Sequence, residues 1–287
     1  MKLKKILIAA LVVPLAFTAC DKSDEADNSR EQVKIVATIG VPTGNQTKAS
    51  FENDGSGAFE AGDEYSLSFW SPTLGMGAIF PYEIGKTTLY WDEVYHDDNP
   101  VDFTAWYPVY SFSGIFIQRY KVADAATEAA KDLLMAPTVT VAVHNPVNLQ
   151  FKHVMHKLTI ILSADFYSAA ELNNAVITLK NLKSDAMVDF ENGTVDETAA
   201  SGTDPYPQKQ GAAANFIVAP QNGLTAGTDL VKIEVAGKTY MYKVPDNLTV
   251  LESGKQLSLT LKLKKGDGVT GDIYIGEDFN PGGGHDG

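Results

Sequence analysis

The sequence contains a single cysteine, Cys20, among its 287 residues. One cysteine excludes an internal disulfide and any metal site built from several thiolates. Basic residues are also few, with 23 Lys and Arg against 36 Asp and Glu, which gives a formal net charge of −13. Because a nucleic-acid-binding protein needs a net basic face, the sequence predicts no nucleic-acid partner.

The apolar run near the start, residues 6–17, is short. It has 12 residues and contains Pro14, whereas a bilayer-spanning helix needs roughly 20. A basic start, a short apolar stretch and a small residue before the processing point are typical of a secretory signal. The run ends in Ala19-Cys20, which resembles a bacterial lipobox. We therefore expect cleavage between Ala19 and Cys20 and lipid attachment at Cys20. A plain signal peptide with a chance cysteine is the alternative.

Residues 20–32 are expected to form an acidic, flexible tether, because the segment has too few apolar residues to pack. Removing residues 1–19 takes away three lysines and no acid, so the mature chain would carry a net charge of −16. Acidic residues directly after the lipidated cysteine resemble the export signals of surface lipoproteins of the Bacteroidetes. A lipid anchor would hold the chain on the outer membrane without a transmembrane helix.

The rest of the chain has the pattern of an all-β protein. Apolar and polar residues alternate along several segments, which is the period of a half-buried strand. Gly-containing turns separate some of them: Asn192-Gly193 and Ala236-Gly237 are both typical of hairpins. Short strands at regular spacing predict a β-sandwich. The clearest alternating segments are 33–39, 231–235, 240–244 and 257–264.

We expect two sandwich domains, at 33–146 and 147–265, followed by a Gly- and Asp-rich tail at 266–287. Each domain would have near 115 residues, a comfortable size for one sandwich. Only residues 123–134 and 168–173 have a helical pattern, and both segments are short.

The search for catalytic or metal-binding motifs is negative. The sequence has no Gly-x-Ser-x-Gly elbow and no P-loop. His153 and His156 are three residues apart, and on one strand this odd spacing would send their side chains to opposite faces, so they could not share an ion. We predict no enzyme activity, no metal and no cofactor.

A series of short segments, in order, resembles the fimbrillin (Mfa-like) family of Bacteroidetes surface lipoproteins. Each segment is weak evidence alone, but their order along almost the whole mature chain is fairly specific. After the lipobox, the tether and the strand at 33–39, the series runs through Thr43–Phe51, Phe59–Leu67, Asp132–Ala136, Val147–Leu158, Ile217–Gln221, Gly237–Tyr242 and Glu252–Leu257.

The resemblance implies two transthyretin-like β-sandwich domains and a role as a subunit, tip or anchor of a cell-surface fimbria assembled by strand exchange. Its partners would be other fimbrial subunits, the outer membrane, and a host or bacterial surface receptor or glycan. An edge strand that leaves its sheet exposes backbone groups and an apolar groove, which a strand from the next subunit can fill. The candidate exchanged strand has Val33, Ile35, Ala37 and Ile39 on one face. The candidate donor segment has Ile273, Ile275 and Phe279 as anchors.

One feature departs from the family pattern. In shaft fimbrillins a protease cuts after an arginine in the loop behind the first strand. Here that loop contains Lys48, and the nearest arginine is Arg30, in front of the strand. Lys48 is therefore the candidate maturation site. The alternatives are that the subunit keeps its strand and its lipid, or that Lys48 is an ordinary loop residue.

A monomeric surface lipoprotein that binds glycans is the second hypothesis. Tryptophan and tyrosine rings stack well on sugars, and the chain has three Trp and 12 Tyr. This hypothesis predicts a cluster of exposed aromatic side chains on one face. Burial of Trp70, Trp91 and Trp106 would remove most of its support.

Overall fold

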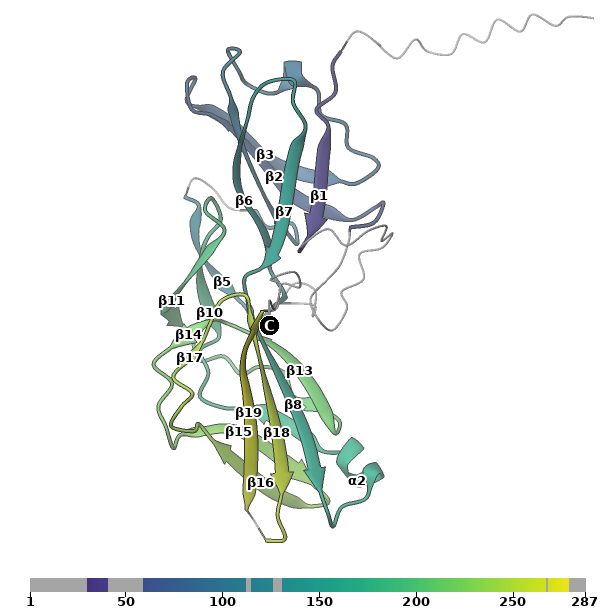
Figure 1. Cartoon of the computed structure of the whole chain (residues 1–287), viewed down its shortest axis with the longest axis vertical. Coiled ribbons are helices and arrows are strands. Elements are labelled where there is room, and N and C mark those ends of the chain that lie inside the picture. Colours follow the sequence, from purple (N-terminus) through teal and green to yellow (C-terminus); the bar gives the residue numbers. More distant parts are fainter. Residues whose placement is uncertain (1–29, 41–58, 112–114, 126–130, 267, 279–287) are drawn as a thin grey trace, which may run out of the picture.

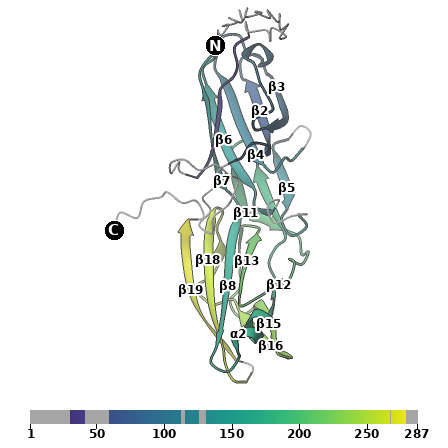
Figure 2. The same ribbon diagram turned by 90° about the vertical axis from the view of Figure 1, so that its right-hand side faces the viewer.

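A computed structural model describes residues 30–40, 59–111, 115–125, 131–266 and 268–278. The described chain consists mainly of strands, which confirms the prediction of an all-β fold; the transthyretin-like topology stays a prediction. Among the described residues, no helix is long and apolar enough to cross a bilayer. Figures 1 and 2 show an elongated molecule with two strand-rich units, one above the other.

The first unit is a six-stranded sheet in the order β1-β7-β6-β4-β2-β3. β6 and β7 pair at only two positions, Leu134 with His153 and Met135 with Lys152. The pairing between β6 and β7 is therefore short, and side chains of β1 and β7 share one core with side chains of the other four strands. The strands are β1 (Ile35–Ile39), β2 (Glu64–Ser71), β3 (Met76–Glu83), β4 (Val101–Tyr107), β6 (Leu134–Val141) and β7 (Val147–His153).

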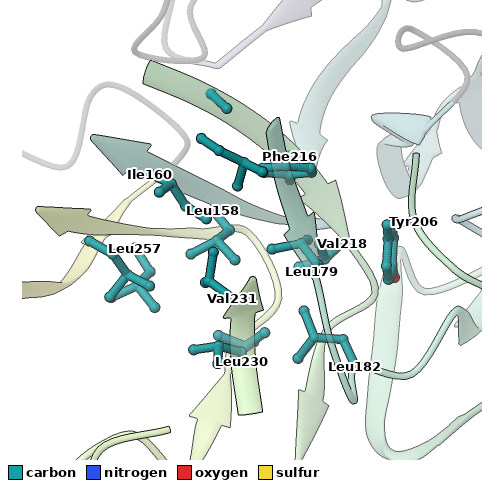
Figure 3. Close-up of a cluster of buried hydrophobic side chains, with 14 of the residues drawn as sticks. Leu158, Ile160, Leu179, Leu182, Tyr206, Phe216, Val218, Leu230, Val231 and Leu257 are labelled. Carbon is teal, nitrogen blue, oxygen red and sulfur yellow. The ribbon is translucent and has the colours of Figure 1, made fainter. Parts of the chain in front are cut away.

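The second unit packs several smaller sheets around a separate core. β8 and β18 lie side by side in parallel at the centre of one four-stranded sheet, between β13 and β19. The other sheets have the orders β12-β9-β15-β16, β11-β10-β5 and β14-β17. Figure 3 shows that Leu158 and Leu257, from neighbouring strands of one sheet, lie close to Val231 of another sheet in this core.

The bounds of the remaining elements are as follows: η1 (Trp91–Glu93), β5 (Ile117–Lys121), β8 (His156–Ala164), α2 (Ala169–Asn173), β9 (Val176–Leu179), β10 (Asp185–Asp189), β11 (Thr194–Ser201), β12 (Lys209–Gln210), β13 (Ala213–Val218), β14 (Gln221–Asn222), β15 (Asp229–Val235), β16 (Lys238–Lys243), β17 (Val250–Leu251), β18 (Lys255–Leu263) and β19 (Val269–Asp278).

Local sequence explains the clearest elements. β18 alternates buried leucines with more exposed Ser, Thr and Lys, as the period-2 pattern predicts. The β15–β16 hairpin turns at Ala236 and Gly237, both with positive φ (47° and 74°), as a two-residue type I′ turn requires. Ser168 caps α2, since its hydroxyl accepts a hydrogen bond from the Glu171 N–H. The predicted segment 168–173 is therefore a helix, whereas residues from Leu134 onward belong to β6.

The expected boundary between residues 146 and 147 differs from the strand pairing. β7 begins at Val147 and belongs to the first sheet, where it pairs with β1 and β6. β5 precedes that boundary but pairs with β10 of the second unit. In addition, the Trp106 ring of β4 packs 5.3 Å from the Phe190 ring of the second unit. Both units therefore use segments from each side of the expected boundary.

The expected tail at 266–287 contains an edge strand. β19 pairs antiparallel with β18 from Lys255 to Leu263. Val269 and Ile273 pack on the second core, although the segment is rich in Gly and Asp and has only a short apolar stretch at Ile273–Ile275. The strand forms because β18 offers a long partner edge, a contact that local composition does not reveal.

Candidate functional site

The candidate exchanged strand, β1, lies at the edge of the first sheet. It pairs with β7 alone, in parallel, from Ile35 opposite Val147 to Ile39 opposite Phe151. Figure 1 shows the two strands side by side at the surface of the first unit. Because one side of β1 has no strand neighbour among the described residues, only one ladder of backbone hydrogen bonds holds it.

One face of β1 packs into the first core. Val33 and Ile39 are buried, and Ile35 and Ala37 are partly buried against the same cluster. On the other face, Lys34 and Val36 are exposed and Thr38 is partly buried. The structure thus places all four predicted residues on the core side, like the side chains of a strand inserted into a groove.

The floor below β1 is apolar. Val147, Leu149 and Phe151 of β7 are buried beside it. The Phe151 ring also contacts the rings of Phe59 and Tyr65, with centroids 4.7 and 5.3 Å away. Removal of β1 would expose these side chains and the free edge of β7, and burial of each is worth about 1.5–3 kcal/mol.

A second set of contacts holds the chain just before β1. The Val33 N–H donates to the Leu89 carbonyl at 2.8 Å, and the Trp91 N–H donates to the Glu31 carbonyl at 2.9 Å. Gln32 and Tyr90 form an antiparallel bridge. This segment therefore has a different partner from β1 itself, and the two attachments together fix both ends of the strand.

The side chain of Arg30 strengthens this attachment. Its guanidinium binds the Asp92 carboxylate through two nitrogens, at 2.7 and 2.5 Å, and Glu93 at 2.8 Å. It also lies over the Tyr90 ring, 4.1 Å from the centroid. The hydrogen bond from Arg30 holds the pKa of Asp92 below its usual value. We call the contacts of Arg30 with Tyr90, Asp92 and Glu93 the Arg30 clamp; sequence reasoning missed it because its members are about 60 residues apart.

The candidate donor segment lies in β19. Ile273 is partly buried against the second core, and the backbone of Ile275 pairs with Leu257. The register shifts next to this pair, which leaves Gly276 as an extra residue on β19. Phe279 lies outside the described residues, as do Ala19, Cys20 and Lys48.

The two neighbouring histidines are buried in different strands. His153 ends β7 and His156 begins β8, so the expectation of one continuous strand was wrong. The His153 ring is 2.8 Å from the Asp132 carboxylate. His156 Nδ1 donates to the Glu252 carbonyl at 2.8 Å, and burial lowers its pKa to about 4. Within the described ranges, no group of three or more His, Cys, Asp or Glu side chains could hold a metal ion.

The tryptophans differ in exposure. Trp91 and Trp106 are 3% and 0% exposed and belong to the two cores, whereas Trp70 is 48% exposed. The glycan hypothesis needs a surface cluster of such rings. Burial of Trp91 and Trp106 weakens this hypothesis, whereas the exposure of Trp70 fits it.

Comparison with family models identifies one family. A family model described as fimbrillin-like matches residues 27–277. No curated protein matches the chain. Among solved structures, a proposed cell adhesion protein from Bacteroides uniformis ATCC 8492 is 19% identical, with a TM-score of 0.64 over 88% of this chain and 99% of that one.

A second proposed cell adhesion protein, from Bacteroides ovatus ATCC 8483, is also 19% identical. Its TM-score is 0.57 over 87% of this chain and 99% of its own. At this identity, the likeness establishes a shared fold across nearly the full length of both relatives.

Proposed function

Because the chain belongs to the fimbrillin-like family, we propose that it is a structural subunit of a bacterial cell-surface fimbria. The role is adhesive or architectural and requires no catalysis. The observation that carries the proposal is the family match over residues 27–277, together with an edge strand, β1, that fills an apolar groove in the first unit.

Assembly by strand exchange is the finer part of the proposal. β1 leaves its place beside β7, and a strand of another subunit takes the groove, pairs with β7 and buries its own alternating apolar side chains there. The incoming strand must place apolar side chains at the four positions now occupied by Val33, Ile35, Ala37 and Ile39. The segment with Ile273, Ile275 and Phe279 is the proposed donor, and because its β19 part pairs with β18 in the free subunit, it must leave that edge before it enters the groove.

Release of β1 requires a cut in the loop behind it, for which Lys48 is the proposed site. A cut at Arg30 would not release β1, because Val33–Ile39 follow it. Arg30 is also held by Asp92 and Glu93. A subunit that is not cut keeps β1 and, with lipid on Cys20, stays on the outer membrane as an anchor.

Limited digestion with trypsin tests the proposal, with Lys48→Gln as the variant and Lys86→Gln as a control for an exposed lysine elsewhere. We expect digestion of the parent chain and of Lys86→Gln to give a ladder of multimers on a denaturing gel without boiling. Lys48→Gln should stay monomeric. A parent chain that is cut at Lys48 but remains monomeric and retains Val33–Ile39 would contradict exchange at β1.

A further inference from the structure

The hairpin formed by β2 and β3 carries an unusual number of exposed apolar side chains. Trp70 is 48% exposed and Ile79 is 41% exposed, and Leu74 and Met76 between them are also exposed. In the part of the chain that the structure describes, β3 is the last strand of its sheet and pairs with β2 alone. An apolar free edge of this kind is a template for pairing with another strand.

The hydrogen-bond register shows which backbone groups of β3 are free. The Ile84 N–H donates to the Asp63 carbonyl at 2.9 Å, and the ladder from Glu64 opposite Glu83 to Ser71 opposite Met76 continues without a shift. In an antiparallel ladder, every second residue bonds to the partner strand. The peptide groups of Gly77 and Ile79, and the carbonyl of Pro81, therefore point away from β2.

The free stretch has a definite end. The Glu83 N–H donates to the Thr87 hydroxyl, and the Glu83 carbonyl accepts from the N–H groups of Lys86 and Thr87. The open edge thus runs from Gly77 to Pro81, with Ile79 at its centre. It carries no charged residue, whereas the free edge of β5 carries Arg119 and Lys121. Two copies with a net charge of −13 each repel one another. An uncharged edge adds no further repulsion where they would meet.

We propose that two copies of the chain pair antiparallel through β3, on a two-fold axis at Ile79. In this register each Ile79 exchanges both backbone hydrogen bonds with its counterpart. Each Gly77 N–H donates to the Pro81 carbonyl of the other copy. With the axis at Ile79, the whole free stretch from Gly77 to Pro81 pairs between the two copies. Because Pro81 has no N–H, each copy lacks only one backbone donor in this pairing.

In this arrangement, the side chains on the outer face of one copy are complementary to those of the other copy. Trp70 lies opposite Gly77, and a Cβ on Gly77 would come within 2.9 Å of the Trp70 ring. The ring therefore lies over Gly77 and extends toward the position that Pro81 of the other copy would take. Ile79 would meet Ile79, and Trp70 would meet Pro81, which forms a continuous apolar strip across both sheets.

This contact would join subunits sideways, and it leaves β1 and β7 free. It therefore does not depend on strand exchange. Because a short interface of this type binds weakly, its measurement needs high protein concentration, up to roughly 1 mM, at physiological salt.

Sedimentation equilibrium of the chain from Asp21 onward tests the proposal, with Ile79→Lys as the variant. Ile161→Lys is the matched control, since Ile161 is also 41% exposed but lies in β8, which has strands on both sides. We expect a reversible dimer for the parent and for Ile161→Lys, and a dissociation constant at least ~10-fold higher for Ile79→Lys. A monomeric parent, or a dimer that Ile79→Lys leaves unchanged, overturns the proposal.

Disulfide trapping tests the register. The chain from Asp21 onward contains no cysteine, so a single Ile79→Cys variant can bond only to a second copy. Facing Cα atoms in a hydrogen-bonded pair are about 5.5 Å apart, within reach of a disulfide. Ile79→Cys should cross-link under mild oxidation and Ile161→Cys should not. Equal cross-linking of both variants, or none at Ile79→Cys, contradicts pairing at Ile79.

Discussion

The two edge strands β1 and β19 are held in different ways. β1 has five residues, pairs in parallel with β7 alone, and depends on the Arg30 clamp just before it. β19 has ten residues and pairs antiparallel along the whole of β18. Its Gly271 lies so close to Leu261 and Tyr242 that a Cβ would come within 2.8 Å of each. The comparison indicates that, in the free subunit, β1 is held more weakly than β19.

Deletion of β1 or of β19 should have the largest effects on stability. Each deletion should change the unfolding transition of its own unit and leave that of the other unit in place. Removal of residues 30–40 takes away Val33 and Ile39, which costs the first unit about 3–6 kcal/mol and exposes an apolar groove. Truncation after Lys265 should abolish the folding transition of the second unit. Thermal unfolding followed by calorimetry, with binding of a hydrophobic dye, distinguishes these results. Equal loss of both transitions in either variant would contradict the division.

The stability of the second unit should fall in acid because of His156. Burial lowers the pKa of this imidazole to about 4 in the folded chain, whereas the unfolded value is about 6.5. Above about pH 6.5 both states are neutral. Between about pH 6.5 and 4 only the unfolded state takes up the proton, so the free energy of unfolding decreases, by at most about 3 kcal/mol.

His156→Asn keeps a donor near the Glu252 carbonyl but does not titrate. Urea unfolding at a series of pH values should show a smaller acid loss for this variant than for the parent. An identical pH dependence in both proteins would mean that His156 is not the responsible group.

Gly271→Val should destabilise the second unit by about 1–3 kcal/mol, since the added side chain collides with Leu261 and Tyr242. Gly268→Val is the control, because nothing lies closer than 3.7 Å to a Cβ at that position. Denaturant midpoints of the two variants give the comparison. A midpoint for Gly271→Val equal to that of the control would show that β19 is loosely held.

Arg30→Ala should have the smallest effect on global stability, because the ion pairs of the clamp are exposed to solvent. Its effect should be local, with faster amide exchange at Val33–Ile39. Lys86→Ala removes an exposed ion pair with Glu83 that is not connected to β1. Exchange rates of β1 that are equal in the two variants would show that the clamp does not hold the strand.

Local patterns in the sequence predicted β1, β18 and the hairpin at Ala236-Gly237, because alternation and turn residues act over a few positions. They indicated at most one strand in the Gly- and Asp-rich tail, but did not predict that β19 pairs with β18 of the same unit along its length. Sequence patterns could not predict the Arg30 clamp either, because Arg30 and Asp92 are 62 positions apart. The strand pairing across the expected boundary could not be predicted for the same reason, because β5 and β7 join sheets that only long-range pairing defines.

Hydrogen exchange read by mass spectrometry compares the two strands most directly. The chain is cut at Lys48, and exchange is followed at the amides of Val33–Ile39 and of Val269–Asp278. If β1 is separable, its amides should exchange at least ~10-fold faster after the cut, through local release, while those of β19 keep the protection of the whole second unit. Equal protection of both strands after the cut would contradict the claim that β1 can leave its sheet.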